Sequence, residues 1–133
     1  MTPDQRRGHE WEITRLIHRY VNLNDAGDWD GVAALYTADG SLRRPSGGEP
    51  VAGRAAILTA FRARPPRAQR HVIANVVVEV ESAVEARAFS VILLAPYAPS
   101  VGPDGPSAPA AATPGGATLG AISVRGVSPA AAT

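Results

Sequence analysis

Hydrophobic side chains recur with helical spacing near the start of the chain. Four of them stand at positions i, i+3, i+4 and i+7, a spacing that brings them onto one buried helical face. They are Ile13, Leu16, Ile17 and Tyr20. Thr2, with Pro3 next and Gln5 three positions on, is typical of a helix N-cap. Residues 22–27, "NLNDAG", collect turn formers and end in glycine, so they predict the end of this helix.

Two shorter helices and a hairpin are predicted next. Asp28 is suited to cap a second helix. The apolar positions of this helix are Trp29, Val32, Ala33, Leu35 and Tyr36. Residues 41–53, rich in glycine and proline, favour a short, loop-rich hairpin. Residues 53–64, "GRAAILTAFRAR", predict a third helix with Phe61 facing inward, and Pro65 ends it.

The clearest strand signal covers residues 71–82, "HVIANVVVEVES", and a second strand follows a turn at 81–83. Strict alternation predicts one wholly apolar face, made of Val72, Ala74, Val76, Val78 and Val80. The other face is mixed and holds His71, Ile73, Asn75, Val77 and Glu79. Because neither face is fully polar, we expect burial on both sides, one against helices and a pocket and the other against a second subunit. The pattern therefore predicts a homodimer.

Composition narrows the chemistry. A chain of 133 residues fits one domain, and a net charge of +1 gives no reason to expect nucleic acid or membrane partners. The chain has no cysteine, and all thirteen basic residues are arginines, which excludes cysteine nucleophiles, thiolate metal sites and Schiff-base lysines. The three histidines have no metal-ligand spacing, so no metal and no cofactor are predicted. The arginine-rich stretch 62–70 is interpreted as a solvated loop.

The C-terminal third changes character. Residues 96–118 are rich in proline, glycine, alanine and serine, which predicts a flexible segment. Residues 119–133 are expected to supply a final strand and a frayed tail to the domain whose core is residues 1–95. No apolar leader precedes the first helix, and no apolar run approaches the length of a membrane span, so a cytoplasmic location is expected.

Three local patterns, taken in order, resemble a known family. They are "RLIHRYVNLNDAGDWDGVAALYTADGS", "GRAAILTAF" and "RHVIANVVVEV". Over residues 9–95 the chain is similar to the SnoaL-like branch of the nuclear-transport-factor-2-like (NTF2-like) fold. That resemblance implies an α+β fold in which a curved, cone-shaped mixed sheet packs on three helices and holds a pocket in its mouth. It covers about two thirds of the chain, and this scaffold carries many unrelated functions.

The resemblance also implies site residues. In the scytalone dehydratase, bile acid dehydratase and hexachlorocyclohexane dehydrochlorinase group, an Asp–His pair is the base of an elimination, often with a tyrosine before the aspartate. Asp25, His71 and Tyr20 match these positions. The alternative roles are ordinary ones: a turn-forming Asp25, a half-exposed His71 at a strand start and a structural Tyr20. Other residues are expected at the pocket as wall or polar contacts, namely Trp29, Tyr36, Phe61, Asn75 and Arg125.

The chain also departs from the family pattern. Phe89 and Ser90 stand where scytalone dehydratase carries a second histidine, and the usual aromatic-plus-arginine last strand is missing, which leaves Arg125 as its one charged candidate. A truncated gene or an altered reading frame after Pro96 would explain this.

Three functions remain open at this stage. The first is a cofactor-independent lyase or isomerase, of dehydratase type, acting on a small cyclic carbonyl compound. The second is a non-catalytic ligand-binding or dimerisation module. The third, weaker one is a cyclase of the polyketide type or a hydrolase.

Overall fold

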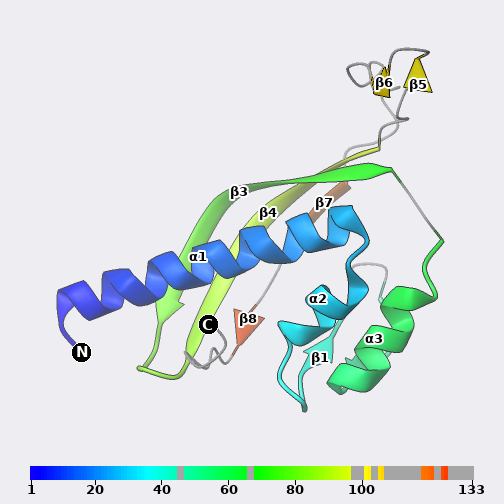
Figure 1. The fold of residues 1–133 in the computed structure, drawn as a ribbon. Coiled ribbons are helices and arrows are strands. Elements are labelled where there is room, and N and C mark those ends of the chain that lie inside the picture. Colours follow the sequence, from blue (N-terminus) through cyan, green and yellow to red (C-terminus); the bar gives the residue numbers. More distant parts are fainter. Residues whose placement is uncertain are drawn as a thin grey trace.

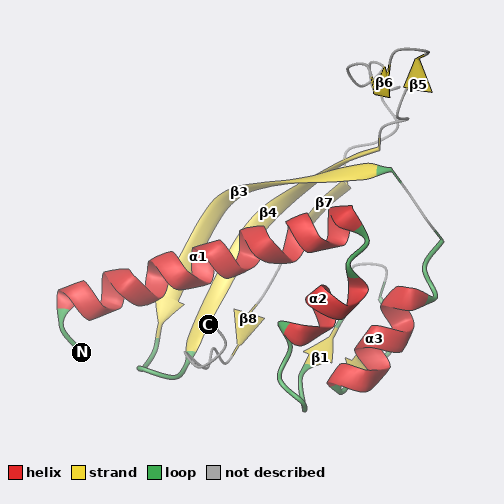
Figure 2. Ribbon diagram, in the orientation of Figure 1, coloured by secondary structure: helices red, strands yellow, loops and turns green. Residues whose placement is uncertain are grey.

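The computed structural model of the chain describes residues 1–44, 47–65 and 68–96, and beyond them the backbone of four short strands. Three helices come first: α1 (Pro3–Ala26), α2 (Trp29–Ala34) and α3 (Arg54–Arg62). A small hairpin of β1 (Ser41–Leu42) and β2 (Val51–Ala52) lies between α2 and α3. The long strands β3 (Gln69–Val80) and β4 (Ala86–Pro96) follow. The α+β architecture is therefore confirmed (Figures 1 and 2).

The ends of α1 are fixed by the residues that predicted them. Thr2 and Gln5 form a reciprocal capping box, so the helix begins directly at Pro3. Gly27 ends the helix in a left-handed conformation, with φ of 69°, where a side chain would cost energy. Asp28 accepts a hydrogen bond from the Gly31 amide and so caps α2. These local signals are the reason that Asp25 lies in the last turn of a long helix.

Helix α1 crosses one face of the sheet and runs antiparallel to β3 (Figure 1). The Arg6 guanidinium donates to the Val80 carbonyl at 2.8 Å near one end, and Asp25 bonds His71 near the other. Nineteen helical residues span about 28 Å and nine strand residues about 30 Å, so the two elements match in length between these contacts. The order of residues along α1 and β3 therefore brings Asp25 to His71.

Strand β4 is central in the larger sheet. It pairs antiparallel with β3 on one side and with β7 (Thr118–Ala121) and β8 (Val124–Arg125) along its length. The short strands β5 (Val101–Gly102) and β6 (Gly105–Pro106) pair with each other. Every pairing in the described residues is antiparallel, where a mixed sheet was expected. The rest of the predicted flexible segment, and the predicted tail, lie outside the described residues.

The alternation predicted for β3 is wrong in its second half. Ala74 pairs with Val91 and Val77 with Phe89, so Asn75 and Val76 together face the single residue Ser90. This is a β-bulge, and Asn75 occupies it with a φ of 51°. One extra residue moves every later side chain to the opposite face. The inner face therefore continues from Ile73 to Val76, not to Asn75.

Two apolar clusters form the core of the described residues. The first joins α1 to the inner face of the sheet, and its buried members are Ile13, Ile17, Val80, Ala86 and Ala88. The second joins α2 and α3 around Val32, Ile57 and Phe61. No helix among the described residues is long and apolar enough to cross a membrane. The opposite, outer face of the sheet carries Val72, Val77, Phe89 and Leu93, which are 40–54% exposed. The burial expected on both faces is thus present on one face within this chain.

Candidate functional site

Asp25 and His71, 46 positions apart in sequence, are in direct contact. The His71 imidazole Nδ1 lies 2.6 Å from Asp25 Oδ1, and the His71 backbone N–H donates to Asp25 Oδ2 at 3.0 Å. The Asp25 side chain is 2% exposed and the His71 side chain 16% exposed. Both carboxylate oxygens are therefore occupied by one residue, which fixes the position of the imidazole ring.

This geometry selects one tautomer of neutral His71. A carboxylate only accepts hydrogen bonds, so Nδ1 of the imidazole must carry the proton that bonds Asp25. The other ring nitrogen, Nε2, then holds a free electron pair. An imidazole held in this way can accept a proton at Nε2, and the adjacent carboxylate stabilises the imidazolium that results.

The charge of Asp25 is balanced from β3 and not from its own helix. The last turn of α1 contains no basic residue, and the partial negative charge of a helix C-terminus disfavours an anion there. The Arg70 guanidinium lies 3.7 Å from Asp25 Oδ2, although 63% of its side chain is exposed and solvent screens much of the interaction. Arg70 belongs to the stretch that was interpreted as a solvated loop, so its place beside the acid was not predicted.

Two tyrosines form a second polar contact. The Tyr36 hydroxyl donates to the Tyr20 hydroxyl at 3.4 Å, and the rings meet edge to face with centroids 6.2 Å apart. Burial, and then the neighbouring Tyr20, raises the pKa of Tyr36 above its ordinary value of 10.0. Like any tyrosine, Tyr36 is protonated at neutral pH and can donate its O–H, and the raised pKa extends this protonation to more alkaline pH. The sequence predicted Tyr36 as pocket wall only, because a contact between side chains sixteen positions apart is set by helix packing.

The remaining predicted contacts divide between core and surface. Trp29 stacks on Phe61, with ring centroids 5.5 Å apart, and Phe61 is 0% exposed. Phe61 thus supports Trp29 from within the core. Asn75 is exposed at the bulge and does not share the face of His71. Arg125 lies in β8, where its backbone pairs with Arg87, and its side chain is outside the described residues.

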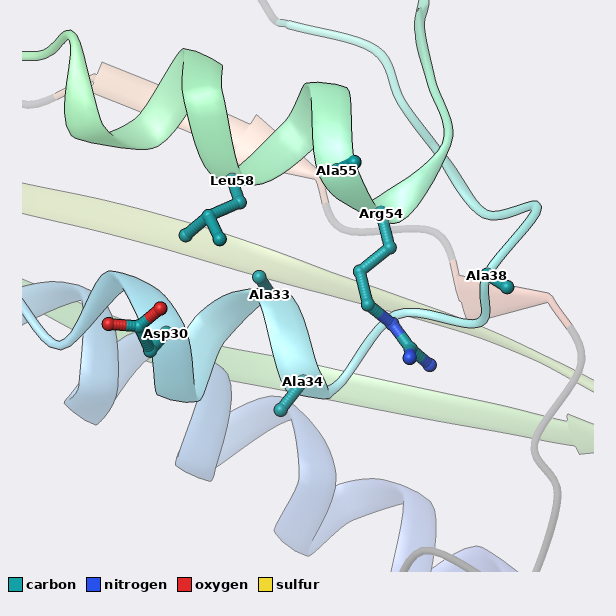
Figure 3. Close-up of a pocket in the computed structure, with 7 residues that line it drawn as sticks. All are labelled: Asp30, Ala33, Ala34, Ala38, Arg54, Ala55 and Leu58. Atoms are coloured by element: carbon teal, nitrogen blue, oxygen red, sulfur yellow. The ribbon is translucent and has the colours of Figure 1, made fainter.

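The hollow drawn in Figure 3 is separate from the Asp25–His71 pair. It is open to solvent, has a volume of about 430 Å³ between α2 and α3 and is lined mainly by alanines, with Asp30, Leu58 and Arg54 around them. The Arg54 guanidinium donates through Nε to the Tyr36 carbonyl at 2.7 Å. None of the residues predicted for the site lines this open hollow. The pocket expected around His71 therefore remains a prediction.

Two buried polar side chains were also missed. Asn24 is 5% exposed and Ser90 is 0% exposed, and neither Asn24 Oδ1 nor Ser90 Oγ has a hydrogen-bond partner. Asn24 could have been found, because it continues the buried stripe of α1 at helical spacing after Ile17 and Val21. Within the described part of the chain, no three His, Cys, Asp or Glu side chains gather as a metal site would require.

Solved structures confirm the fold. The chain is 22% identical to a provisionally named scytalone dehydratase from Novosphingobium aromaticivorans, with a TM-score of 0.65 over 71% of this chain and 64% of that one. An NTF2-like protein with a cystatin-like fold from the same organism is 27% identical, with a TM-score of 0.60 over 68% of this chain and 62% of the other. The matches thus span less than two thirds of either relative.

A third structure is covered more completely. ActVI-ORFA from Streptomyces coelicolor is 20% identical, with a TM-score of 0.59 over 89% of this chain and 82% of that one. The family comparison covers most of the chain, because residues 5–107 match the SnoaL-like domain. The chain therefore belongs to the SnoaL-like domain family and has the NTF2-like fold.

Proposed function

We propose that the protein is a cofactor-independent lyase of dehydratase type, which eliminates water from a small cyclic carbonyl compound that carries a β-hydroxyl. One observation carries this proposal. A half-buried imidazole, fixed through Nδ1 by a nearly inaccessible carboxylate, leaves Nε2 as an oriented base. Membership of the SnoaL-like family and the fold shared with a provisionally named scytalone dehydratase support it.

The proposed reaction needs no group from outside the chain. His71 Nε2 takes a proton from the carbon next to the carbonyl, while the Tyr20 hydroxyl donates a hydrogen bond to the carbonyl oxygen as negative charge develops there. Tyr20 accepts from Tyr36, which leaves its own hydrogen for this bond. The C–O bond to the β-hydroxyl then breaks, and the imidazolium returns its proton to the leaving oxygen. A hydroxyketone thus becomes a conjugated enone and water.

The spacing of the groups is compatible with one small ring. Tyr20 precedes Asp25 by five residues on α1, which is about 7.5 Å along the helix axis. In the proposed step the donor meets the carbonyl oxygen and the base meets the carbon next to the carbonyl, and a donor and a base placed in this way lie a comparable distance apart. Proton transfer by a positioned base of this kind contributes a rate factor of about 10²–10⁴.

The test uses 3-hydroxycyclohexanone as substrate and follows the ultraviolet absorbance of cyclohex-2-enone. Wild-type protein should accelerate enone formation, and His71→Gln should abolish the acceleration while circular dichroism stays unchanged. His18→Gln is the matched control, since His18 is exposed on α1 and belongs to neither contact described above. Equal rates for the wild type and His71→Gln would refute the proposed function.

A second candidate function is a non-catalytic dimerisation or ligand-binding module, and the outer face of the sheet favours it. Cross-strand pairing brings Val72 beside Leu93 and Val77 beside Phe89, so the four exposed apolar residues form two pairs on the outer face of the sheet. Exposed apolar surface of this kind marks an interaction site. We propose that a second copy of the chain covers it, which is compatible with either function. Sedimentation velocity should therefore show a dimer.

A further inference from the structure

Asn24 and Ser90 are the two described residues with a buried side-chain oxygen that lacks a hydrogen-bond partner. Buried polar groups in folded proteins are almost always bonded, so an exception needs an explanation. Such a group lowers stability, because it loses its bonds to water and gains none from the protein. Asn24 lies in the last turn of α1 and Ser90 lies on the inner face of β4, and these positions suggest different explanations.

Asn24 lies between the two polar contacts of the candidate site. It follows Tyr20 by four residues and precedes Asp25 by one. At about 100° per residue, Asn24 is about 40° around the helix from Tyr20 and about 100° from Asp25. The Asn24 side chain therefore leaves the helix between the direction of Tyr20, which bonds Tyr36, and that of Asp25, which holds the imidazole.

Ser90 lies farther from this site. His71 pairs with Leu94, which is four residues further along β4, or about 13 Å. Ser90 instead stands opposite the bulge at Asn75 and Val76. It is thus a second buried oxygen without a partner, on β4 and not on α1, and it serves as an internal comparison for Asn24.

We infer that Asn24 is a specificity-determining residue, whose side-chain carbonyl accepts a hydrogen bond from a hydroxyl group of the ligand. The inference rests on the proposed function, because it places the ligand between Tyr20 and His71. Asn24 Oδ1 is an acceptor, so its partner must bring an O–H or N–H donor. A hydroxylated ketone supplies that donor, whereas the same ketone without the hydroxyl leaves the buried oxygen unpaired.

The experiment compares two ketones that cannot lose water by β-elimination, 4-hydroxycyclohexanone and cyclohexanone. NMR titration of ¹⁵N-labelled full-length protein measures both affinities, and thermal unfolding measures stability. Wild-type protein should prefer the hydroxylated ketone about fivefold, the value of one neutral hydrogen bond. Asn24→Leu should abolish the preference and raise the unfolding midpoint by about 4 °C, since it removes an unpaired buried group.

Two further variants keep the test decisive. The alanine in Asn24→Ala is smaller than asparagine and cannot clash with its surroundings. This variant should abolish the preference whether or not the variant with the larger leucine folds. Ser90→Ala is the matched control and should leave the preference at its wild-type value. Equal affinities or no binding of either ketone by the wild type, a preference that survives in Asn24→Ala, or a preference lost in Ser90→Ala would each overturn the inference.

The outcome is separable from that of the proposed function. Binding of 4-hydroxycyclohexanone requires no base, so His71→Gln should keep the preference while it loses elimination. A wild type that forms no enone but shows an Asn24-dependent preference would refute the lyase and leave the ligand contact standing. An active wild type without the preference would refute the role of Asn24 alone.

Discussion

Replacing Asp25 by asparagine should invert the tautomer of His71. The wild-type carboxylate accepts two hydrogen bonds from His71, one from the backbone N–H and one from Nδ1. The backbone N–H is always a donor, so the amide oxygen of an asparagine must face it. The amide NH₂ then faces Nδ1 and requires a lone pair there, which moves the ring proton to Nε2. The nitrogen that should act as base would become a donor.

The size of the effect follows from this geometry. In a Ser-His-Asp triad, the corresponding Asp→Asn change lowers turnover about 10⁴-fold through the wrong tautomer, and we expect a loss of about 10³–10⁴-fold here. Stability should change much less. A hydrogen bond to a charged group contributes about 1.5–3 kcal/mol, but the variant keeps a neutral bond and removes an anion from a helix C-terminus. We expect the free energy of unfolding to fall by about 1–2 kcal/mol.

The assay measures directly which ring nitrogen of His71 carries the proton, and it needs no substrate. Long-range ¹H–¹⁵N correlation spectra distinguish protonated Nδ1 from protonated Nε2, and they should show the Nδ1–H form in neutral wild-type His71 and the Nε2–H form in Asp25→Asn. Asp39→Asn, a change of the same chemistry at an exposed turn, should behave as wild type. An Asp25→Asn variant with an unchanged tautomer and wild-type enone formation would refute the orienting role of Asp25.

Three further predictions concern Tyr36, the bulge and the outer face of the sheet. The raised pKa of Tyr36 means that, as the pH rises, the unfolded chain loses the phenol proton before the folded chain does. The contribution of Tyr36 to the free energy of unfolding is therefore fully present below pH 10.0, and it falls as the pH rises further, by up to about 1.4 kcal/mol per pH unit. Urea unfolding from pH 9 to 11 should show this loss, and Tyr36→Phe should reduce the slope; an unchanged slope would contradict the burial of the phenol. Asn75→Ala should lower the free energy of unfolding by about 1 kcal/mol because φ is positive there, whereas Asn75→Gly should not; equal losses in chemical denaturation would argue against the bulge. Phe89→Asp should convert the proposed dimer to a monomer in sedimentation velocity, and a dimer that persists would exclude this face as the interface.

The sequence predicted the helices well because their boundaries are encoded locally. The capping box at Thr2 and Gln5, the glycine at 27 and the cap at Asp28 each act within a few residues, and the structure contains all of them. The bulge in β3 was not predictable from alternation, since one inserted residue leaves no periodic signature. The only hint was Asn75 itself, because asparagine tolerates a positive φ better than most residues.

The candidate site shows the same division between features that the local sequence encodes and features that depend on tertiary packing. Asp25 and His71 were selected by family resemblance, because no local rule joins residues 46 positions apart. Their contact depends on the matched lengths of α1 and β3. The hydroxyl contact of Tyr36 and the approach of Arg70 to Asp25 depend on tertiary packing in the same way. Asn24 is different, since a polar residue on an apolar stripe is visible in the sequence.

The most direct test of the central claim is proton exchange next to a carbonyl, which requires no leaving group. When 1-tetralone is incubated with the protein in D₂O, ¹H NMR follows the loss of the hydrogens on the carbon beside the carbonyl. If His71 Nε2 is the base, wild-type protein should exchange them faster than buffer, by about 10²-fold or more at saturation, and His71→Gln should match buffer. Exchange at the buffer rate with wild-type protein, or at equal enzymatic rates in both proteins, would contradict the account.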